Sequence, residues 1–197
     1  MIKMYNTNMT TNITTEVNEY KRGNWINMIN PTESEIEDVC KNLAIEQDFI
    51  RYSLDYEEKA RIDLEEDDGT ILFIIDVPII ERENDVEIYT TMPVGVIFVR
   101  DEYVITVSLK ENDIIKKMER VVGKKVITYK KSQFLFQLFY ENSSAFLNLL
   151  KEINARGTTI VVATHAKDIV DRMNKRVIRI DDGNIVRDEK GGYDSEI

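Results

Sequence analysis

The sequence predicts an α/β fold, in which a larger α/β domain is followed by a short tail of strand, helix and hairpin. Three segments rich in Val, Ile, Phe and Thr, at 70–78, 87–99 and 103–109, indicate neighbouring strands. Helical spacing of apolar residues before and after this block supplies the helices that such a sheet needs. A second β-rich run at 158–165, followed by a helical pattern and a hairpin signal, predicts the tail.

The first helix is predicted from its start signal. After a strand-like beginning and an alternating segment at 24–29, Asn30-Pro31 stops the strand. Thr32 and Glu35 have the spacing of a capping box, in which each side chain satisfies a backbone amide of the first turn. The apolar residues that follow at helical spacing should be buried; they are Ile36, Val39, Cys40 and Leu43.

A second helix is expected from Glu46 or Gln47 through Leu54, and it is followed by the densest acidic stretch of the chain, 55–69. Oxygen-rich loops suit magnesium or calcium, but this stretch lacks the residue pattern of a calcium-binding loop. A solvated run of charge is the favoured interpretation.

In the strand block, Pro93 is expected to interrupt the second strand, and residues 100–102 should form a tight hairpin connection to the third. We assign no catalytic role to this turn. A helix is then predicted at 112–122 with Gly123 as its stop, a strand at 124–129, and a long helix at 132–154 that is rich in Phe and Leu.

Composition narrows the function classes. The formal net charge is −10, and residues 151–197 carry nine Lys/Arg and nine Asp/Glu, so the whole excess lies in residues 1–150. Such a surface repels nucleic acid. With one cysteine and one histidine, neither an internal disulfide nor a Cys/His zinc site is expected.

The apolar stretches of the sequence indicate the cellular location of the chain. The first residues lack the apolar core of a secretory signal, and the longest apolar stretches are shorter than the roughly 20 residues that cross a bilayer. We therefore expect a cytoplasmic chain without a membrane-spanning segment.

The first 150 residues resemble the amino-terminal cytoplasmic domain of CorA-type magnesium transporters. The resemblance lies in the order of Gly23-Asn24-Trp25 through Asn30-Pro31-Thr32, the acidic stretch, Tyr89-Thr90-Thr91-Met92-Pro93, Asp101-Glu102-Tyr103 and the long helix. It implies an α/β/α domain with a mixed sheet that forms a homo-oligomeric ring of five and senses Mg²⁺ through carboxylates between subunits. The candidate carboxylates are chosen by their place at the end of the strand at 71–80 and not by a match to family sensor residues; they are Glu81, Glu83 and Asp85.

The family's pore triplet, Gly-Met-Asn, and its membrane helices do not occur in these 197 residues, so transport by this chain alone is not expected. Magnesium needs only one or two carboxylates because it keeps several waters. Without the pore, the resemblance implies at most a regulatory Mg²⁺-binding surface.

The last 50 residues resemble the carboxyl end of FtsE-like ABC ATPases of cell division. The resemblance is carried by 149–159, by the run ending in Thr164-His165, and by Lys175-Arg176-Val177-Ile178 with the hairpin turned by Asp182-Gly183. His165 matches the histidine that contacts the γ-phosphate in that family. No phosphate-binding loop or Leu-Ser-Gly-Gly signature occurs in the chain, so we expect no ATP binding and no enzymatic activity.

These observations predict a fusion of a CorA-like cytoplasmic domain, 1–146, with an FtsE-like fragment, 147–197, joined within 146–154. Both parent families act at the cytoplasmic face of a membrane. Two further hypotheses remain: a regulatory module that senses Mg²⁺ or binds a full-length transporter, and an ATPase fragment that needs a complementary chain.

Overall fold

The computed structural model describes residues 1–84 and 86–192. The chain divides into two compact units, Met1–Ala145 and Phe146–Ile197. Helix α4 (Lys131–Ala155) contributes residues to both.

Unit 1 is built on a seven-stranded mixed sheet with the strand order β2-β1-β3-β7-β6-β5-β4. The central pair β3 and β7 is parallel, and the other neighbours are antiparallel. The strands are β1 (Ile2–Thr7), β2 (Thr14–Val17), β3 (Asn24–Ile29), β4 (Arg61–Leu64), β5 (Ile71–Glu83), β6 (Val86–Val99) and β7 (Tyr103–Ser108).

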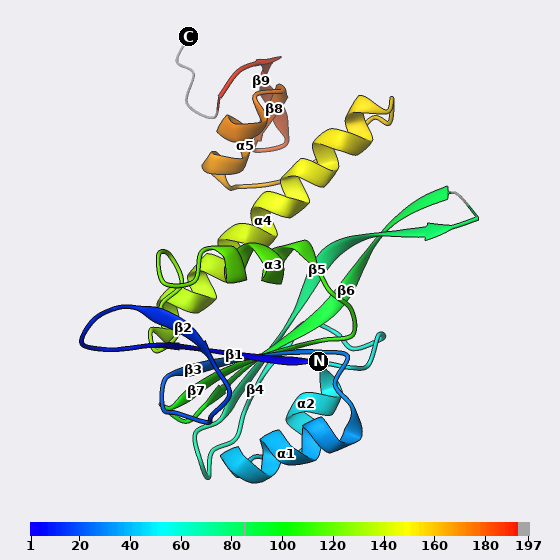
Figure 1. Cartoon of the computed structure of the whole chain (residues 1–197). Coiled ribbons are helices and arrows are strands. Elements are labelled where there is room, and N and C mark those ends of the chain that lie inside the picture. Colours follow the sequence, from blue (N-terminus) through cyan, green and yellow to red (C-terminus); the bar gives the residue numbers. More distant parts are fainter. Residues whose placement is uncertain (85, 193–197) are drawn as a thin grey trace. The chain divides into compact units, whose positions relative to one another are not determined.

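Helices cover both faces of this sheet (Figure 1). Helices α1 (Glu33–Leu43) and α2 (Asp48–Tyr52) lie on one face, and α3 (Asp113–Arg120) with the first part of α4 lies on the other. Each face has its own apolar core: one contains Trp25, Ile114 and Phe134, and the other contains Ile26, Ile36 and Ile105. The predicted α/β/α domain with a mixed sheet is confirmed.

Helix α1 begins where its local signals place it. Thr32 accepts a hydrogen bond from the Glu35 amide at 3.3 Å, and the Glu35 carboxylate accepts from the Thr32 amide at 2.8 Å. This is the predicted capping box, which satisfies two amides that the helix cannot pair itself. The predicted stripe of Ile36, Val39, Cys40 and Leu43 is buried.

The strands of unit 1 differ in several details from the sequence predictions. Strands β2 and β4 were not expected, and β4 lies within the stretch interpreted as solvated charge. Strand β6 continues through Pro93, which pairs with Asp76. Because pairing with β7 begins only at Val94, β6 has no neighbour on that side at Pro93, and a residue without a backbone N–H is tolerated there.

Residues 124–129 form no strand, which corrects the prediction. They turn tightly after α3, with the Gly123 amide donating to the Val126 carbonyl at 2.8 Å. Side chains then replace a strand ladder: the Thr7 amide donates to Thr128 Oγ1 at 2.8 Å, and the Thr128 amide donates to Thr7 Oγ1 at 3.1 Å.

Unit 2 contains the end of α4, helix α5 (Lys167–Met173) and a hairpin of β8 (Arg176–Asp181) and β9 (Asn184–Lys190). Asp182 and Gly183 both have positive φ, which suits the predicted hairpin turn. Among the described residues of this unit, Leu147 is the one buried apolar side chain.

The strand expected at 158–165 is not formed. The segment has neither helical nor strand structure, and no described strand pairs with it. An apolar run becomes a strand only when a neighbouring strand satisfies its backbone amides and carbonyls. None of the described strands does this for the segment at 158–165.

Candidate functional site

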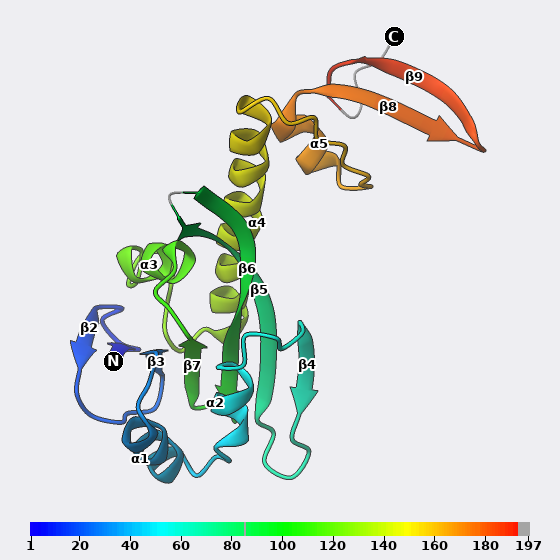
Figure 2. The same ribbon diagram turned by 90° about the vertical axis from the view of Figure 1, so that its right-hand side faces the viewer.

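Strands β5 and β6 extend beyond the rest of the sheet as a two-stranded arm (Figure 2). They pair over their whole lengths, from Ile71 opposite Phe98 to Glu83 opposite Val86. Strand β4 pairs only with residues 71–74, and β7 only with residues 94–99. The arm therefore comprises residues 75–83 and 86–93, and it positions two of the three candidate carboxylates.

Glu81 and Glu83 lie two residues apart on β5, so their side chains share one face of the arm. Glu81 Oε1 accepts a hydrogen bond from Lys110 Nζ at 2.7 Å. Glu83 is exposed, and Asp85 lies outside the described residues. The structure therefore places a basic side chain against the first candidate carboxylate.

Lys110 follows β7 and reaches the arm from the chain segment that leaves the sheet. Its hydrogen bond with Glu81 and the charge of that carboxylate raise the pKa of the Lys110 ammonium group. The ammonium group also lies 5.9 Å from the centre of the Tyr56 ring, within range of a cation–π interaction. Lys110 stays cationic at neutral pH and balances part of the arm's negative charge.

Sequence reasoning missed Lys110 because its partner is 29 residues away and on a non-adjacent strand. The arm's other face carries a second ion pair, with Arg82 Nη2 3.2 Å from Glu87 Oε1. That pair joins the two strands near the tip and does not involve Glu81 or Glu83.

The donor chemistry of the arm fits a magnesium ion. Glu81 and Glu83 offer carboxylate oxygens, which Mg²⁺ prefers, and one or two carboxylates with water complete its octahedral shell. Within residues 1–84 and 86–192, no group of three or more His, Cys, Asp and Glu side chains is arranged to hold a metal. A site here would rely on these two carboxylates and water, and Mg²⁺ would compete with Lys110 for Glu81.

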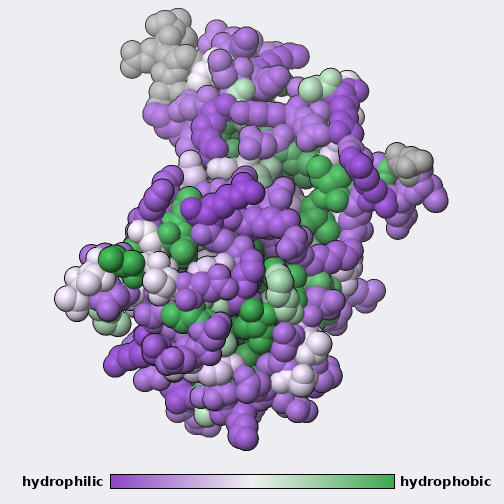
Figure 3. Space-filling model, viewed as in Figure 1, coloured by the Kyte–Doolittle hydropathy of each residue, from purple (hydrophilic) through white to green (hydrophobic). Residues whose placement is uncertain are grey.

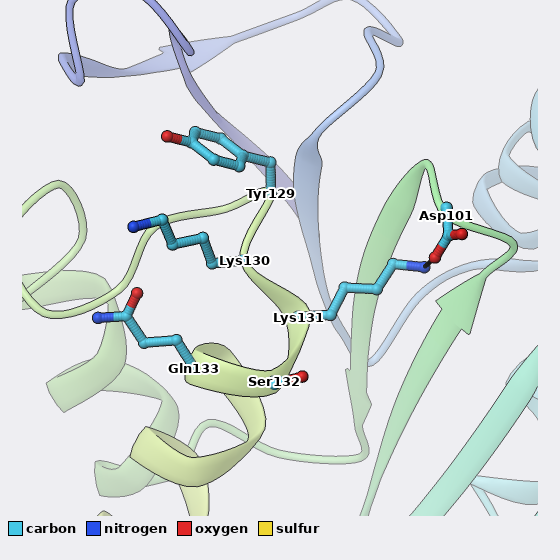
Figure 4. Close-up of a pocket in the computed structure, with 6 residues that line it drawn as sticks. All are labelled: Asp101, Tyr129, Lys130, Lys131, Ser132 and Gln133. Carbon is cyan, nitrogen blue, oxygen red and sulfur yellow. Dashed lines mark ion pairs between the residues drawn. The ribbon is translucent and has the colours of Figure 1, made fainter.

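A pocket of about 400 Å³ lies where α4 begins (Figure 4). It is lined by Asp101, Tyr129, Lys130, Lys131, Ser132 and Gln133. Lys131 points toward Asp101, and its Nζ lies 3.5 Å from Asp101 Oδ1 and 5.4 Å from the centre of the Phe98 ring. No local sequence pattern indicates this pocket, because it lies between a hairpin turn and the start of a helix that is distant in the chain.

Burial lowers the pKa of the Lys131 ammonium group, and the charge of Asp101 opposes that shift. Because Lys131 is already paired, the pocket is accounted for by the packing of the helix start, and we assign no ligand to it.

His165 is exposed and lies in the irregular segment before α5. The strand that was expected to present it is not formed in the described part of the chain. Hydrophilic side chains cover most of the face drawn in Figure 3, with apolar side chains in separate patches. None of the helices in the described part of the chain combines the length and apolar character needed to cross a membrane.

Solved structures share the fold of unit 1. The soluble domain of CorA from Methanocaldococcus jannaschii is 17% identical, with a TM-score of 0.67 over 79% of this chain and 61% of that one. The complete CorA magnesium transporter from the same organism gives 16% identity and a TM-score of 0.63, covering 48% of that chain. The ZntB cytoplasmic domain from Vibrio parahaemolyticus is 10% identical with a TM-score of 0.60, over 78% of this chain and 62% of that one.

A separate similarity links part of the chain to cell division ATP-binding proteins. FtsE from Bacillus subtilis is 58% identical over 52 residues, and FtsE from Mycobacterium tuberculosis is 46% identical over 52 residues. Each match covers 26% of this chain and 23% of the relative, so the chain spans about a quarter of the length of these curated proteins. The predicted combination of a CorA-type domain with a short FtsE-like segment is confirmed.

The family model described as CorA-like Mg²⁺ transporter protein matches residues 20–182. The match includes the sheet from β3 onward, the arm and the whole of α4. Since it covers well over half of the chain, this protein belongs to the family of CorA-like Mg²⁺ transporter proteins.

Proposed function

We propose that unit 1 is a magnesium-responsive regulatory domain in which a hydrated Mg²⁺ replaces Lys110 at Glu81. The observation that carries this proposal is the 2.7 Å contact between Lys110 Nζ and Glu81 Oε1, on the face of β5 that also carries Glu83. The family and the solved CorA structures support magnesium as the ion.

The exchange accounts for a weak, reversible response. A solvent-exposed ion pair is worth about 0–1 kcal/mol, so displacing Lys110 costs little. That cost corresponds to at most about a fivefold weaker affinity for Mg²⁺, because about 1.4 kcal/mol changes an affinity tenfold. Glu83, on the same face, supplies the second carboxylate.

The test is calorimetric titration of the whole chain with Mg²⁺. Lys110→Ala should tighten the apparent Kd for Mg²⁺ about two- to fivefold, because the competing cation is gone. Glu81→Gln should weaken Mg²⁺ binding strongly, because the amide offers one neutral oxygen in place of a negatively charged carboxylate.

Lys21→Ala is the matched control, since Lys21 Nζ pairs with Glu19 Oε2 at 3.1 Å in the segment before β3. It removes the same charge without touching the arm and should leave the Kd unchanged. Equal effects of Lys110→Ala and Lys21→Ala would reduce the proposal to a general charge effect.

We further propose that the domain acts at the cytoplasmic face of a membrane and assembles into a homo-oligomeric ring, a pentamer by family resemblance. Light scattering with and without millimolar Mg²⁺ tests the assembly. A magnesium-dependent change in mass supports it, and a mass that stays constant contradicts the proposed dependence of assembly on Mg²⁺.

The proposed role is binding and regulation, with no transport or catalysis by this chain alone. Uptake of Mg²⁺ into vesicles that contain the purified chain would overturn that assignment.

A second candidate function is an FtsE-like ATPase fragment, and the 58% identity to the Bacillus subtilis protein favours it. It predicts that the chain binds MgATP. Titration with MgATP should show no heat of binding if the regulatory proposal is right, whereas saturable binding that is lost in His165→Ala would favour the fragment.

A further inference from the structure

Residues 158–164, hereafter the 158–164 segment, form an uncharged run of Thr-Thr-Ile-Val-Val-Ala-Thr between Gly157 and His165. The composition is that of a strand, yet no described strand pairs with it. Val161 is 91% exposed and Val162 is 47% exposed. The Thr158 carbonyl already accepts from Asn154 Nδ2 at 3.0 Å, and no described strand pairs with the residues that follow Thr158.

We propose that the 158–164 segment pairs antiparallel with the same segment of a second copy of this chain, with Val161 opposite Val161 at the centre. The interaction is an edge-to-edge backbone ladder and requires no metal or nucleotide.

The sequence of the segment is self-complementary in this register. In a two-fold symmetric antiparallel ladder centred on Val161, Ile160 lies opposite Val162, Thr159 opposite Ala163 and Thr158 opposite Thr164. The threonine pair at each end contributes about 0.2–1 kcal/mol, and the branched residues at the centre favour extended backbone. A ladder centred on any other residue leaves part of the segment unpaired.

Charge also favours a second copy of the segment over the two edge strands of the unit 1 sheet, β2 and β4. The segment itself carries no charge, and beyond its ends Arg156 would lie opposite Ala166, so no like charges meet. The edge strands of unit 1 are different: β2 carries Glu16, and β4 carries Arg61 and Asp63, which pair with each other at 2.7 Å. Charged side chains on edge strands disfavour pairing with another chain.

The expected dimer is weak. An isolated pair of strands is marginal in water, so the ladder should form in proportion to protein concentration and be lost on dilution. A covalent trap therefore measures it better than mass alone.

The trap is Val161→Cys in a Cys40→Ala background, which removes the one native cysteine. Directly opposite residues of an antiparallel pair have Cα atoms about 4.5–5.5 Å apart, within the range of about 4.4–6.8 Å that a disulfide spans. Mild oxidation with oxidised glutathione should convert the variant to a covalent dimer. Val186→Cys, on β9 and 54% exposed, is the matched control and should remain monomeric.

The register has its own test. Ile160→Cys and Val162→Cys chains should cross-link efficiently when mixed, and poorly when each is oxidised alone. Equal cross-linking of Val161→Cys and Val186→Cys, or no preference for the mixed pair, would overturn the proposal. All reactions contain a chelator, so failure here leaves the magnesium proposal untouched, and failure of the magnesium proposal leaves this one untouched. Circular dichroism of each variant before oxidation checks that it is folded.

Discussion

The Tyr5 hydroxyl group donates a hydrogen bond to Glu119 Oε1 across 3.0 Å, which ties β1 to α3. The same oxygen accepts from Asn27 Nδ2 at 3.1 Å. Asn27 Oδ1 in turn accepts from Thr106 Oγ1 at 3.0 Å, and Thr106 accepts from the Trp25 indole at 2.9 Å. A single carboxylate thus anchors α3 to a polar chain that runs through the central strands.

Glu119→Ala should lower the free energy of unfolding by about 1–3 kcal/mol, because it leaves the Tyr5 and Asn27 donors without their shared acceptor. Urea denaturation followed by circular dichroism measures the change. Glu111→Ala removes an exposed carboxylate just before α3 and should change stability by no more than about 0.5 kcal/mol. If the two variants unfold at the same urea concentration, the network contributes nothing measurable.

Stability should fall at alkaline pH through two tyrosines. Burial, followed by interactions with Glu119, raises the pKa of Tyr5 well above its ordinary value of 10, and burial with the hydrogen bond to Asp38 does the same for Tyr20. A raised pKa in the folded state contributes stability that is complete below pH 10 and decreases as the pH rises from 10 toward the folded pKa.

The double variant Tyr5→Phe and Tyr20→Phe should therefore lose less stability than the wild type between neutral pH and pH 11, although it is less stable at neutral pH. Thermal unfolding at a series of pH values measures the slopes. Parallel slopes would show that other groups dominate the alkaline response.

Gly95 on β6 has no room for a side chain. A Cβ at this position would collide with the side chain of Ser53, which is fully buried at the end of α2. Gly95→Ala should therefore cost about 1–3 kcal/mol, as overpacking of a core does. Adding Ser53→Gly should recover part of the loss, since it removes the colliding atoms; additive losses in the double-mutant cycle would contradict direct contact.

The features that could be predicted from sequence are those set by near neighbours in the chain. Thr32 and Glu35 define the start of α1 by themselves, and the turn at Asp182-Gly183 defines the β8–β9 hairpin. Contacts between distant segments escaped prediction. Arg100 donates to the Leu43 carbonyl at the end of α1 across 57 residues, and no local pattern indicates that partner.

The candidate site likewise combines residues that the local sequence indicates with contacts that it does not. The carboxylates Glu81 and Glu83 can be read from the end of a strand, but the length of the arm and the approach of Lys110 depend on where β4 and β7 stop pairing. The 158–164 segment shows the reverse case. Its residues favour a strand, but strand formation depends on a neighbour, and the described chain supplies none.

Unit 2 should open far more readily than unit 1. Ordering a residue costs about 1–2 kcal/mol of backbone entropy, whereas a fully buried apolar side chain returns about 1.5–3 kcal/mol. Leu147 is the one buried apolar side chain among the unit's described residues, while Ile178, Ile180 and Ile185 remain 49%, 66% and 65% exposed. Burial there cannot balance the cost of order.

Hydrogen exchange of the whole chain at low concentration should therefore show amides of β8 and β9 exchanging near the rate of an unfolded chain. Amides of the central strands β3 and β7 should exchange slowly, because they open only with the fold as a whole. Raising the protein concentration should add protection at 158–164 if the segment pairs with a second copy. Strong protection of β8 and β9 in dilute solution would mean that unit 2 is stabilised by contacts other than its own core.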